Sequence, residues 1–461
     1  MATSTATDEQ VPRDCPTGPS GRTERFGLLS LLLAVALILH QLWWGGFEVL
    51  SVHGLVVLVA LWALLAPTSV PRFLAMLATE VTALALDMPA LGSHTVLVLV
   101  CGTCLLVDTG ATALRARRMP TPGELFERAA PFLRTGLIVV YAAAALAKMN
   151  TDFVDPARSC AATMSRQVTW FDPSLLDVPW RIETAIWGTL LVEVSLPVLL
   201  AVRRTRRLGL VVGVGFHAVL ALAGNVPFSA LALALYVAFL PAGPPLRAPR
   251  RGLSRGISSV ALLVAVGAWS AGAALTVTHA AAVATVIAWG TRLAVLVLVA
   301  GAGLVLVACR GHDTEPPRSP MRSPVLVAGI LLLVLNATSP YLGLKTESSF
   351  EMFSNLRTEA GRWNHLVVPE AMRVFGAQDE LVRIIASSDP ALTARTAGGT
   401  RLVRFEVERY LRSRPGSVVT YAVAGPTGET IRTAGPVPAS TPLIDRVAFF
   451  EDVAPPGRGG C

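Results

Sequence analysis

Long apolar runs separated by short polar connections dominate the chain between residues 26 and 342. Many runs hold close to twenty residues, about the length that a helix needs to cross the hydrocarbon core of a bilayer. The apolar residues fill these runs and form no amphipathic stripe, which is typical of membrane-embedded helices. The pattern predicts about eleven spans, at Phe26–Trp44, Leu50–Ala66, Phe73–Leu91, His94–Leu114, Pro131–Met149, Thr184–Val202, Leu208–Gly224, Val226–Pro241, Ile257–Thr278, Val283–Cys309 and Pro324–Leu342.

The two ends of the chain are polar. Residues 1–25 are rich in Thr, Pro and Asp and have no signal-peptide core, so we expect a disordered cytoplasmic N-terminus. Residues 343–461 are long enough to form a small domain. β-Branched and apolar runs divided by Pro and Gly predict a β-rich module there, with strands at Leu381–Ser387, Leu402–Val407 and Val418–Ala424.

The segment Tyr341–Pro369 joins the last span to these strands and is too polar to be a span itself. We expect it to lie against the membrane or to cap the helix bundle. Its large side chains suit packing in that place; they are Phe350, Met352, Phe353, Trp363 and His365.

Composition and charge agree with a membrane protein. Hydrophobic residues make up 53% of the chain and charged residues 15%, which excludes a soluble protein. The net charge of +8 lies in arginine clusters at every second connection, as the positive-inside rule requires for a cytoplasmic N-terminus. The chain shows no zinc-type cysteine spacing and no basic-aromatic groove, so we expect no metal site and no nucleic-acid partner. The sequence thus predicts a multi-pass plasma membrane protein whose C-terminal module is extracytoplasmic.

Lys148 is unusual because the chain contains two lysines, Lys148 and Lys345, among 39 basic residues. It ends an apolar run and would lie where that helix leaves the membrane at the outer face. A desolvated lysine can act as a base, whereas arginine keeps its proton. The alternative is that Lys148 only reaches the headgroups and interacts favourably with the helix dipole.

Glu193 and His217 are ionisable residues inside predicted spans. Such residues are costly in hydrocarbon and usually face a partner or a cavity. One outward-facing cavity could hold both together with Lys148; alternatively, they bind each other or a loop arginine and only brace the helices. Further ionisable residues in spans could form a buried charge network, namely Glu80, Asp87 and Arg292.

The cysteines suggest little chemistry. Cys101 and Cys104 fall in one span, where buried thiols usually serve packing and less often form a redox pair. Cys160 and Cys461 are the outer thiols and could bridge in an oxidising compartment.

A set of spaced residues carries a resemblance to a known family. An aromatic-led helix ends in Lys and is followed by Asn and Asp-Phe; a Glu-Pro helix, a basic turn and a Phe-His helix joined to one with Phe-Ser come next. These positions are Tyr141, Lys148, Asn150, Asp152, Phe153, Glu193, Pro197, Arg203, Arg204, Phe216, His217, Phe228 and Ser229. Between Pro131 and Pro241 the chain resembles the HTTM domain, the membrane module shared with vitamin K-dependent gamma-carboxylases.

The resemblance implies a chemistry. In the carboxylases the matching lysine is the base that deprotonates reduced vitamin K, and an apolar cavity favours its neutral form. It therefore implies Lys148, Glu193 and His217 as catalytic residues and a reduced, vitamin K-like quinone as cofactor. The expected cofactor-binding residues are Tyr141, Asn150, Asp152, Phe216 and Phe228.

Two departures narrow the resemblance. Ala147 stands where the carboxylases have a further lysine, and the outer module is much smaller than theirs. Relatives in bacteria include a maturation factor of a secreted peptide toxin, so a secreted peptide is a candidate substrate. The sequence thus predicts an all-α polytopic HTTM-type membrane protein with a β-rich outer module, acting as a quinone-linked carboxylase- or epoxidase-like enzyme or maturation factor. The alternative is a non-enzymatic membrane scaffold or small-molecule carrier.

Overall fold

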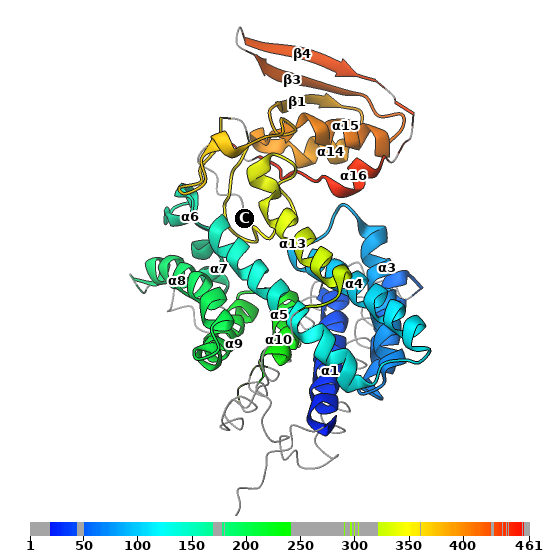
Figure 1. The fold of residues 1–461 in the computed structure, drawn as a ribbon. Helices are drawn as coiled ribbons and strands as arrows, with labels where there is room; N and C mark the ends of the chain where they lie inside the picture. The colour runs from blue at the N-terminus through cyan, green and yellow to red at the C-terminus, as the bar shows by residue number, and fades with distance from the viewer. Residues whose placement is uncertain are drawn as a thin grey trace, which may run out of the picture.

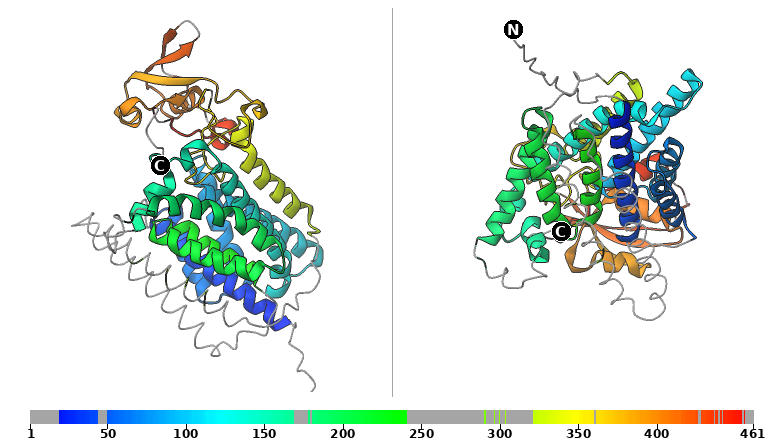
Figure 2. Two further views of the ribbon diagram at one scale, coloured as in Figure 1. Left: turned by 90° about the vertical axis from the view of Figure 1, so that its left-hand side faces the viewer. Right: turned by 90° about the horizontal axis from the view of Figure 1, so that it is seen from below.

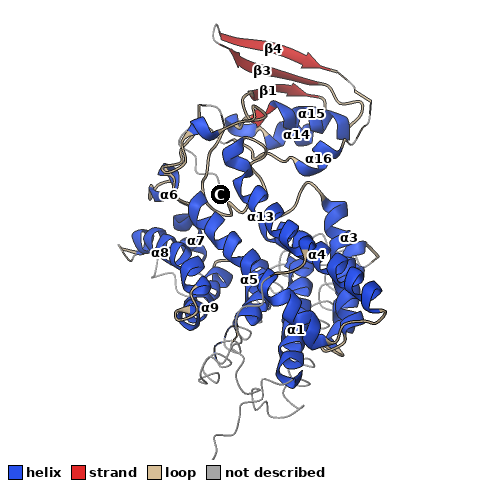
Figure 3. Cartoon of the chain, in the orientation of Figure 1, coloured by secondary structure: helices blue, strands red, loops and turns tan. Residues whose placement is uncertain are grey.

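The computed structural model describes residues 19–43, 50–168, 178, 180–240, 290, 296, 299, 303, 321–359, 361–425, 428–435, 437–438, 440, 442–453 and 455. Within this part of the chain, the helices before residue 343 form a bundle, and the C-terminal residues form a layer across one end of it (Figure 1). The strands lie in this end layer (Figure 3).

The bundle helices lie side by side in both views of Figure 2. They are α1 (Pro19–Trp43), α2 (Val52–Leu64), α3 (Val70–Asp87), α4 (Ser93–Ala116), α5 (Pro122–Ala147), α8 (Arg181–Ala201), α9 (Arg206–Leu222), α10 (Val226–Tyr236) and α13 (Pro324–Leu342).

Among the described residues, five helices are long and apolar enough to cross a membrane, namely α1, α4, α5, α8 and α13. This confirms a mainly helical membrane protein, but not the predicted eleven spans. Helices α2 and α10 are apolar but shorter than a usual span. The predicted span Ile257–Thr278 and Arg292 lie outside the part of the chain described, and of the predicted span Val283–Cys309 only residues 290, 296, 299 and 303 are described.

Helix α5 is the centre of the bundle and packs against α1, α4, α8, α10 and α13. The prediction that it begins at Pro131 is wrong, because it begins at Pro122. The Thr121 side chain accepts a hydrogen bond from the Glu124 backbone, and the Glu124 side chain accepts one from the Thr121 backbone. This capping box provides hydrogen-bond partners for amides at the start of the helix. Because its residues are polar, the first turns of α5 do not belong to the apolar run from which the helix was predicted.

Helices α9 and α10 are joined by a three-residue turn in which Gly224 has φ of 95°. The two helices pack against each other, and α10 also packs against α1. This confirms the tight hairpin predicted from the near-continuous apolar pair, and it brings residues of α9 next to α5.

The C-terminal module is a mixed α/β layer. Its antiparallel sheet has the order β2-β1-β3-β4, formed by β1 (Leu381–Ser387), β2 (Leu402–Val403), β3 (Val419–Gly425) and β4 (Gly428–Ala434). Helices α14 (Pro390–Arg395) and α15 (Arg404–Ser413) supply Leu392, Val407 and Leu411 to a core shared with the sheet. The short helix α16 (Leu443–Val447) follows.

The prediction of a strand over Leu402–Val407 is wrong beyond Val403, where α15 begins. Val407 and Leu411 are four residues apart and both buried, which is the spacing of one helix face. Ion pairs between residues four apart add to the helix; they join Glu408 to Arg404 and to Arg412. Strand β4 was not predicted, because an exposed edge strand needs few apolar residues.

Candidate functional site

Lys148 is the C-cap residue of α5 and is only 4% exposed. Its Nζ donates a hydrogen bond of 2.8 Å to the main-chain carbonyl of Met352. Nζ also lies 3.0 Å from Oε2 of Glu193 and 5.9 Å from the centre of the Phe153 ring. A lysine that only reached the headgroups would be exposed, so this one is held inside the protein by specific partners.

Glu193 lies in α8 and is 6% exposed. Its Oε2 makes the ion pair with Lys148 but has no hydrogen-bond partner among the described residues. The ammonium group has three N–H donors, and one of them makes the hydrogen bond to Met352. The site therefore contains a buried carboxylate paired with a buried lysine, and because a carboxylate oxygen has two lone pairs Oε2 can accept a further hydrogen bond.

Tyr141 lies two helical turns before Lys148 on α5, so both side chains leave the same face, roughly 10 Å apart along the axis. Its hydroxyl lies 2.5 Å from Nε2 of His217 and 2.5 Å from the hydroxyl of Tyr236. Both residues belong to the α9–α10 hairpin. The face of α5 that carries Lys148 thus also carries a buried row of hydroxyl and imidazole groups.

The hydrogen bonds fix the direction of this row. Ser229 donates to the carbonyl of Asn225 at 2.7 Å, so its oxygen can accept from Nδ1–H of His217 at 3.4 Å. Nε2 of His217 then accepts from the hydroxyl of Tyr141, which in turn accepts from Tyr236. His217 is neutral in this arrangement, with its proton on Nδ1.

Phe228 forms an aromatic wall beside the row. The centre of its ring lies 5.1 Å from that of His217 and 6.5 Å from that of Tyr141. The centre of the His94 ring lies 6.2 Å from that of Phe228, and Nε2 of His94 lies 3.3 Å from Nδ1 of His40. The rings and polar atoms together provide a largely apolar environment with a few directed hydrogen-bonding groups, as small-molecule sites do.

Most residues of this site fall within a stretch of sequence that matches a known protein family. Residues 78–241 match the model described as the HTTM domain. The chain contains an HTTM domain. A comparison with curated proteins finds no match, and a comparison with solved structures finds none either. Lys148, Glu193, Tyr141, His217 and Tyr236 all lie within the matched residues, whereas Met352 comes from outside them.

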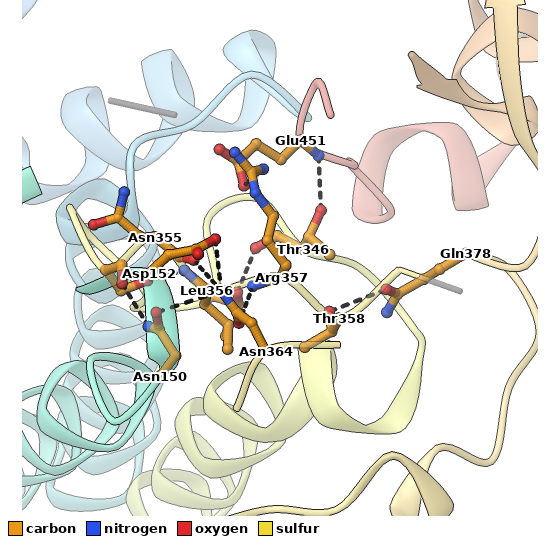
Figure 4. Close-up of polar contacts among 12 residues, drawn as sticks. Asn150, Asp152, Thr346, Asn355, Leu356, Arg357, Thr358, Asn364, Gln378 and Glu451 are labelled. Carbon is orange, nitrogen blue, oxygen red and sulfur yellow. Dashed lines mark hydrogen bonds and ion pairs between the residues drawn. The ribbon is translucent and has the colours of Figure 1, made fainter. Parts of the chain in front are cut away.

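Asn150 and Asp152 lie at the end of the HTTM domain that faces the C-terminal module. Asn150 donates to the carbonyls of Ala147 and Ser354, at 2.7 and 2.6 Å. Asn364 donates to Oδ2 of Asp152 at 3.1 Å, and Figure 4 shows this network between the two segments. Both residues therefore join the short helix α6 (Thr151–Val154) to the chain after α13, away from the hydroxyl of Tyr141.

His365 covers the end of α5 from the same side. Its Nδ1 accepts from the backbone N–H groups of Val367 and Val368, so Nε2–H donates to the carbonyl of Leu146 at 2.9 Å. Burial lowers the pKa of His365, in agreement with a neutral ring. The packing role expected for this segment is confirmed for Phe350, which is fully buried against the bundle, but it is wrong for Phe353, whose side chain is 44% exposed.

The structure brings the three predicted catalytic residues to one face of α5. Glu193 forms an ion pair with Lys148, and His217 forms a hydrogen bond with Tyr141. Glu193 and His217 are not bonded to each other in the described contacts. Phe216 packs edge-on against His217 at 5.7 Å. Tyr236 was not predicted from the sequence. The signal that could have found it is a tyrosine in an otherwise apolar helix, because a buried tyrosine hydroxyl usually has a hydrogen-bond partner.

The other predicted charges have separate partners. Gln41 donates to Oε2 of the buried Glu80 at 3.1 Å, and His53 lies 3.4 Å from Asp87. Cys101 and Cys104 are buried free thiols. Cys160 is disulfide-bonded, and Cys461, the partner that the sequence suggests, lies outside the described residues.

Proposed function

We propose that the protein is an HTTM-type enzyme that binds a reduced, quinone-like lipid and uses Lys148 as the base toward its hydroxyl group. The observation that carries this proposal is the burial of Lys148 against Glu193 inside the HTTM domain. The domain suggests a membrane protein related to vitamin K-dependent carboxylase. A buried lysine next to a carboxylate is placed to exchange a proton with a bound ligand. A lysine on the surface exchanges protons with water instead.

The residues present fit a quinol. Oε2 of Glu193 makes the ion pair with Lys148 and has a second lone pair, which can accept a hydrogen bond from a ligand hydroxyl beside Lys148. Tyr141 and His217 can orient a second polar group, and Phe228 offers a ring face for an aromatic ligand. A quinol supplies an acidic hydroxyl group and, with dioxygen, the oxidation that gives an epoxide and water. The role of the chain is to hold the ring, take a proton on Nζ and exclude water.

The test is the pair of variants Lys148→Arg and Lys148→Ala, with Lys345→Arg as the matched control. Arginine keeps the positive charge and the ion pair with Glu193 but cannot serve as a base. Purified protein is given a reduced naphthoquinone under oxygen, and epoxide formation is followed by mass spectrometry. We expect a loss of at least about a hundredfold in both Lys148 variants, the usual size of a general-base contribution, and none in Lys345→Arg.

Retention of bound naphthoquinone is measured on the same samples. Full epoxide formation by Lys148→Arg would show that Lys148 is not a base. Quinone binding without turnover in every variant, the wild type included, would support the alternative of a carrier or scaffold.

We also propose that the C-terminal module lies outside the plasma membrane, with the N-terminus in the cytoplasm. The alternating arginine clusters support this orientation. The disulfide of Cys160, in the connection after α5, fits an oxidising compartment. Leu443 is 77% exposed in the module and is a suitable reporter. A cysteine at this position, in a chain without native cysteines, should react with an impermeant maleimide on intact cells; protection until lysis contradicts the orientation.

A further inference from the structure

Residues 346–356, here called the strap, run from just beyond α13 across the end of α5 without forming a helix or strand. The strap is bound to the bundle along its length. Ser348 donates to the carbonyl of Leu91, and the Phe350 backbone N–H donates to the Ser93 hydroxyl at 3.2 Å. The strap lies outside the residues that match the HTTM domain.

The strap has an unusual backbone. Four of its residues that are not glycine have left-handed φ values: Ser348 at 63°, Phe350 at 71°, Phe353 at 52° and Asn355 at 58°. Asn tolerates this conformation, but for a bulky residue it is rare. Such conformations persist only where the surroundings determine them, and they concentrate at functional sites.

Side chains from the bundle and the connection after α5 hold the strap in this form. Asn336 donates to the carbonyl of Ser348 at 2.9 Å, and Asn150 donates to that of Ser354 at 2.6 Å. Between these two anchors lies Met352, whose carbonyl accepts the hydrogen bond of Lys148. The left-handed residues of the strap therefore flank the carbonyl that contacts the nitrogen of the proposed base.

This contact has a chemical consequence. A lysine can accept a proton only through a free lone pair, and an ammonium group has three hydrogens and none. Here Nζ lies 2.8 Å from the carbonyl of Met352 and 3.0 Å from the carboxylate of Glu193, so the hydrogens of Nζ face two protein oxygens.

We propose that the strap masks Lys148 and is a gate: the Met352 carbonyl must leave Nζ before Lys148 can act on a ligand, and a ligand hydroxyl takes its place. The inference rests on the proposed function in assigning Lys148 as the base. Release is favoured by the left-handed conformations, because an extended strap relieves them.

The experiment changes the backbone preference of the strap without touching Lys148. Phe353 is 44% exposed and left-handed, so Phe353→Ala and Phe353→Gly remove the same ring, but only glycine accepts this φ at no cost. Full-length protein in detergent is treated briefly with acetic anhydride, which acylates neutral amines. Mass spectrometry then gives acylation at Lys148 relative to Lys345, the other lysine of the chain.

We expect the ratio to be roughly fivefold lower in Phe353→Gly than in Phe353→Ala, because glycine stabilises the masking conformation. Phe353→Val, which is β-branched, should raise the ratio above that of alanine. Equal ratios in the three variants would overturn the proposal, and so would a parallel rise at both lysines with a lower melting temperature.

A second pair guards against misfolding at residue 353. Ser348→Gly and Ser348→Ala both lose the hydrogen bond to Leu91 and differ in the same backbone preference. The same order, with glycine below alanine, is expected. The acylation ratio shows whether the strap masks Lys148 even if Lys148→Arg keeps full epoxide formation. The two proposals can therefore fail separately.

Discussion

The ion pair between Lys148 and Glu193 allows a quantitative test. The variants are Glu193→Gln, Lys148→Met and the double variant. Glu193→Gln leaves a buried ammonium group with the Met352 carbonyl and the Phe153 ring. Lys148→Met leaves a buried carboxylate with no counter-charge. The double variant contains neither charge, and its side chains have similar volumes to those they replace.

The expected magnitudes follow from burial, since the two residues are 4% and 6% exposed. Removing one partner of a buried ion pair costs about 3–5 kcal/mol in soluble proteins. In a bilayer the unfolded helices also find polar partners, so we expect the lower end, about 3 kcal/mol for each single variant. Replacing both charges is often close to neutral, so the double variant should cost about 1 kcal/mol. The cost of the double variant should thus be well below the sum of the singles.

Unfolding in mixed micelles with increasing SDS, followed by the fluorescence of the nine tryptophans, measures these free energies. The control cycle uses the exposed pair Arg118 and Glu124, with side chains 57% and 43% exposed. Arg118→Met and Glu124→Gln should show little coupling, because water and salt screen an exposed ion pair. If the Lys148 and Glu193 variants are additive within about 0.5 kcal/mol, the two residues do not form the pair described and the argument for the site is refuted.

Two further predictions concern other parts of the structure. A Cβ at Gly213 would clash with the hydroxyl of Tyr236, whereas one at Gly215 meets nothing within 4 Å. Gly213→Ala should therefore lower the free energy of unfolding by about 1–3 kcal/mol, and Gly215→Ala should not. Equal melting temperatures of the two variants would contradict the packing of Tyr236 on α9. In the module, burial raises the pKa of Glu451 from 4.5 to about 8, although Arg357 opposes it. Because the folded protein then binds more protons than the unfolded chain between these two values, stability should fall as pH rises through that window. Glu451→Gln should flatten the dependence measured by melting between pH 5 and 9, while the exposed Glu380→Gln should not.

The sequence by itself determined the class of protein and most of the helices. Apolar runs of about twenty residues have few alternatives to a helix in a membrane, and α4, α8 and α13 agree with their predicted ranges to within a few residues. The sequence also singled out Lys148, Glu193 and His217, because an ionisable residue in hydrocarbon is costly and so draws attention. Strand β1 was predicted residue for residue, since β-branched runs between turns are a local signal.

Only the tertiary structure decided which of these residues meet. Spacing along α5 puts Tyr141 and Lys148 on one face, but the packing of α8 and α9 assigns Glu193 to Lys148 and His217 to Tyr141. The Met352 carbonyl could not be predicted at all, because every residue has a main-chain carbonyl and only the left-handed path of the strap brings this one to Nζ. From Arg404 the chain forms a helix and not a strand, because the buried face and the ion pairs of α15 outweigh the local β propensity. Partners that are distant in sequence are set by packing, and packing leaves no local pattern to read.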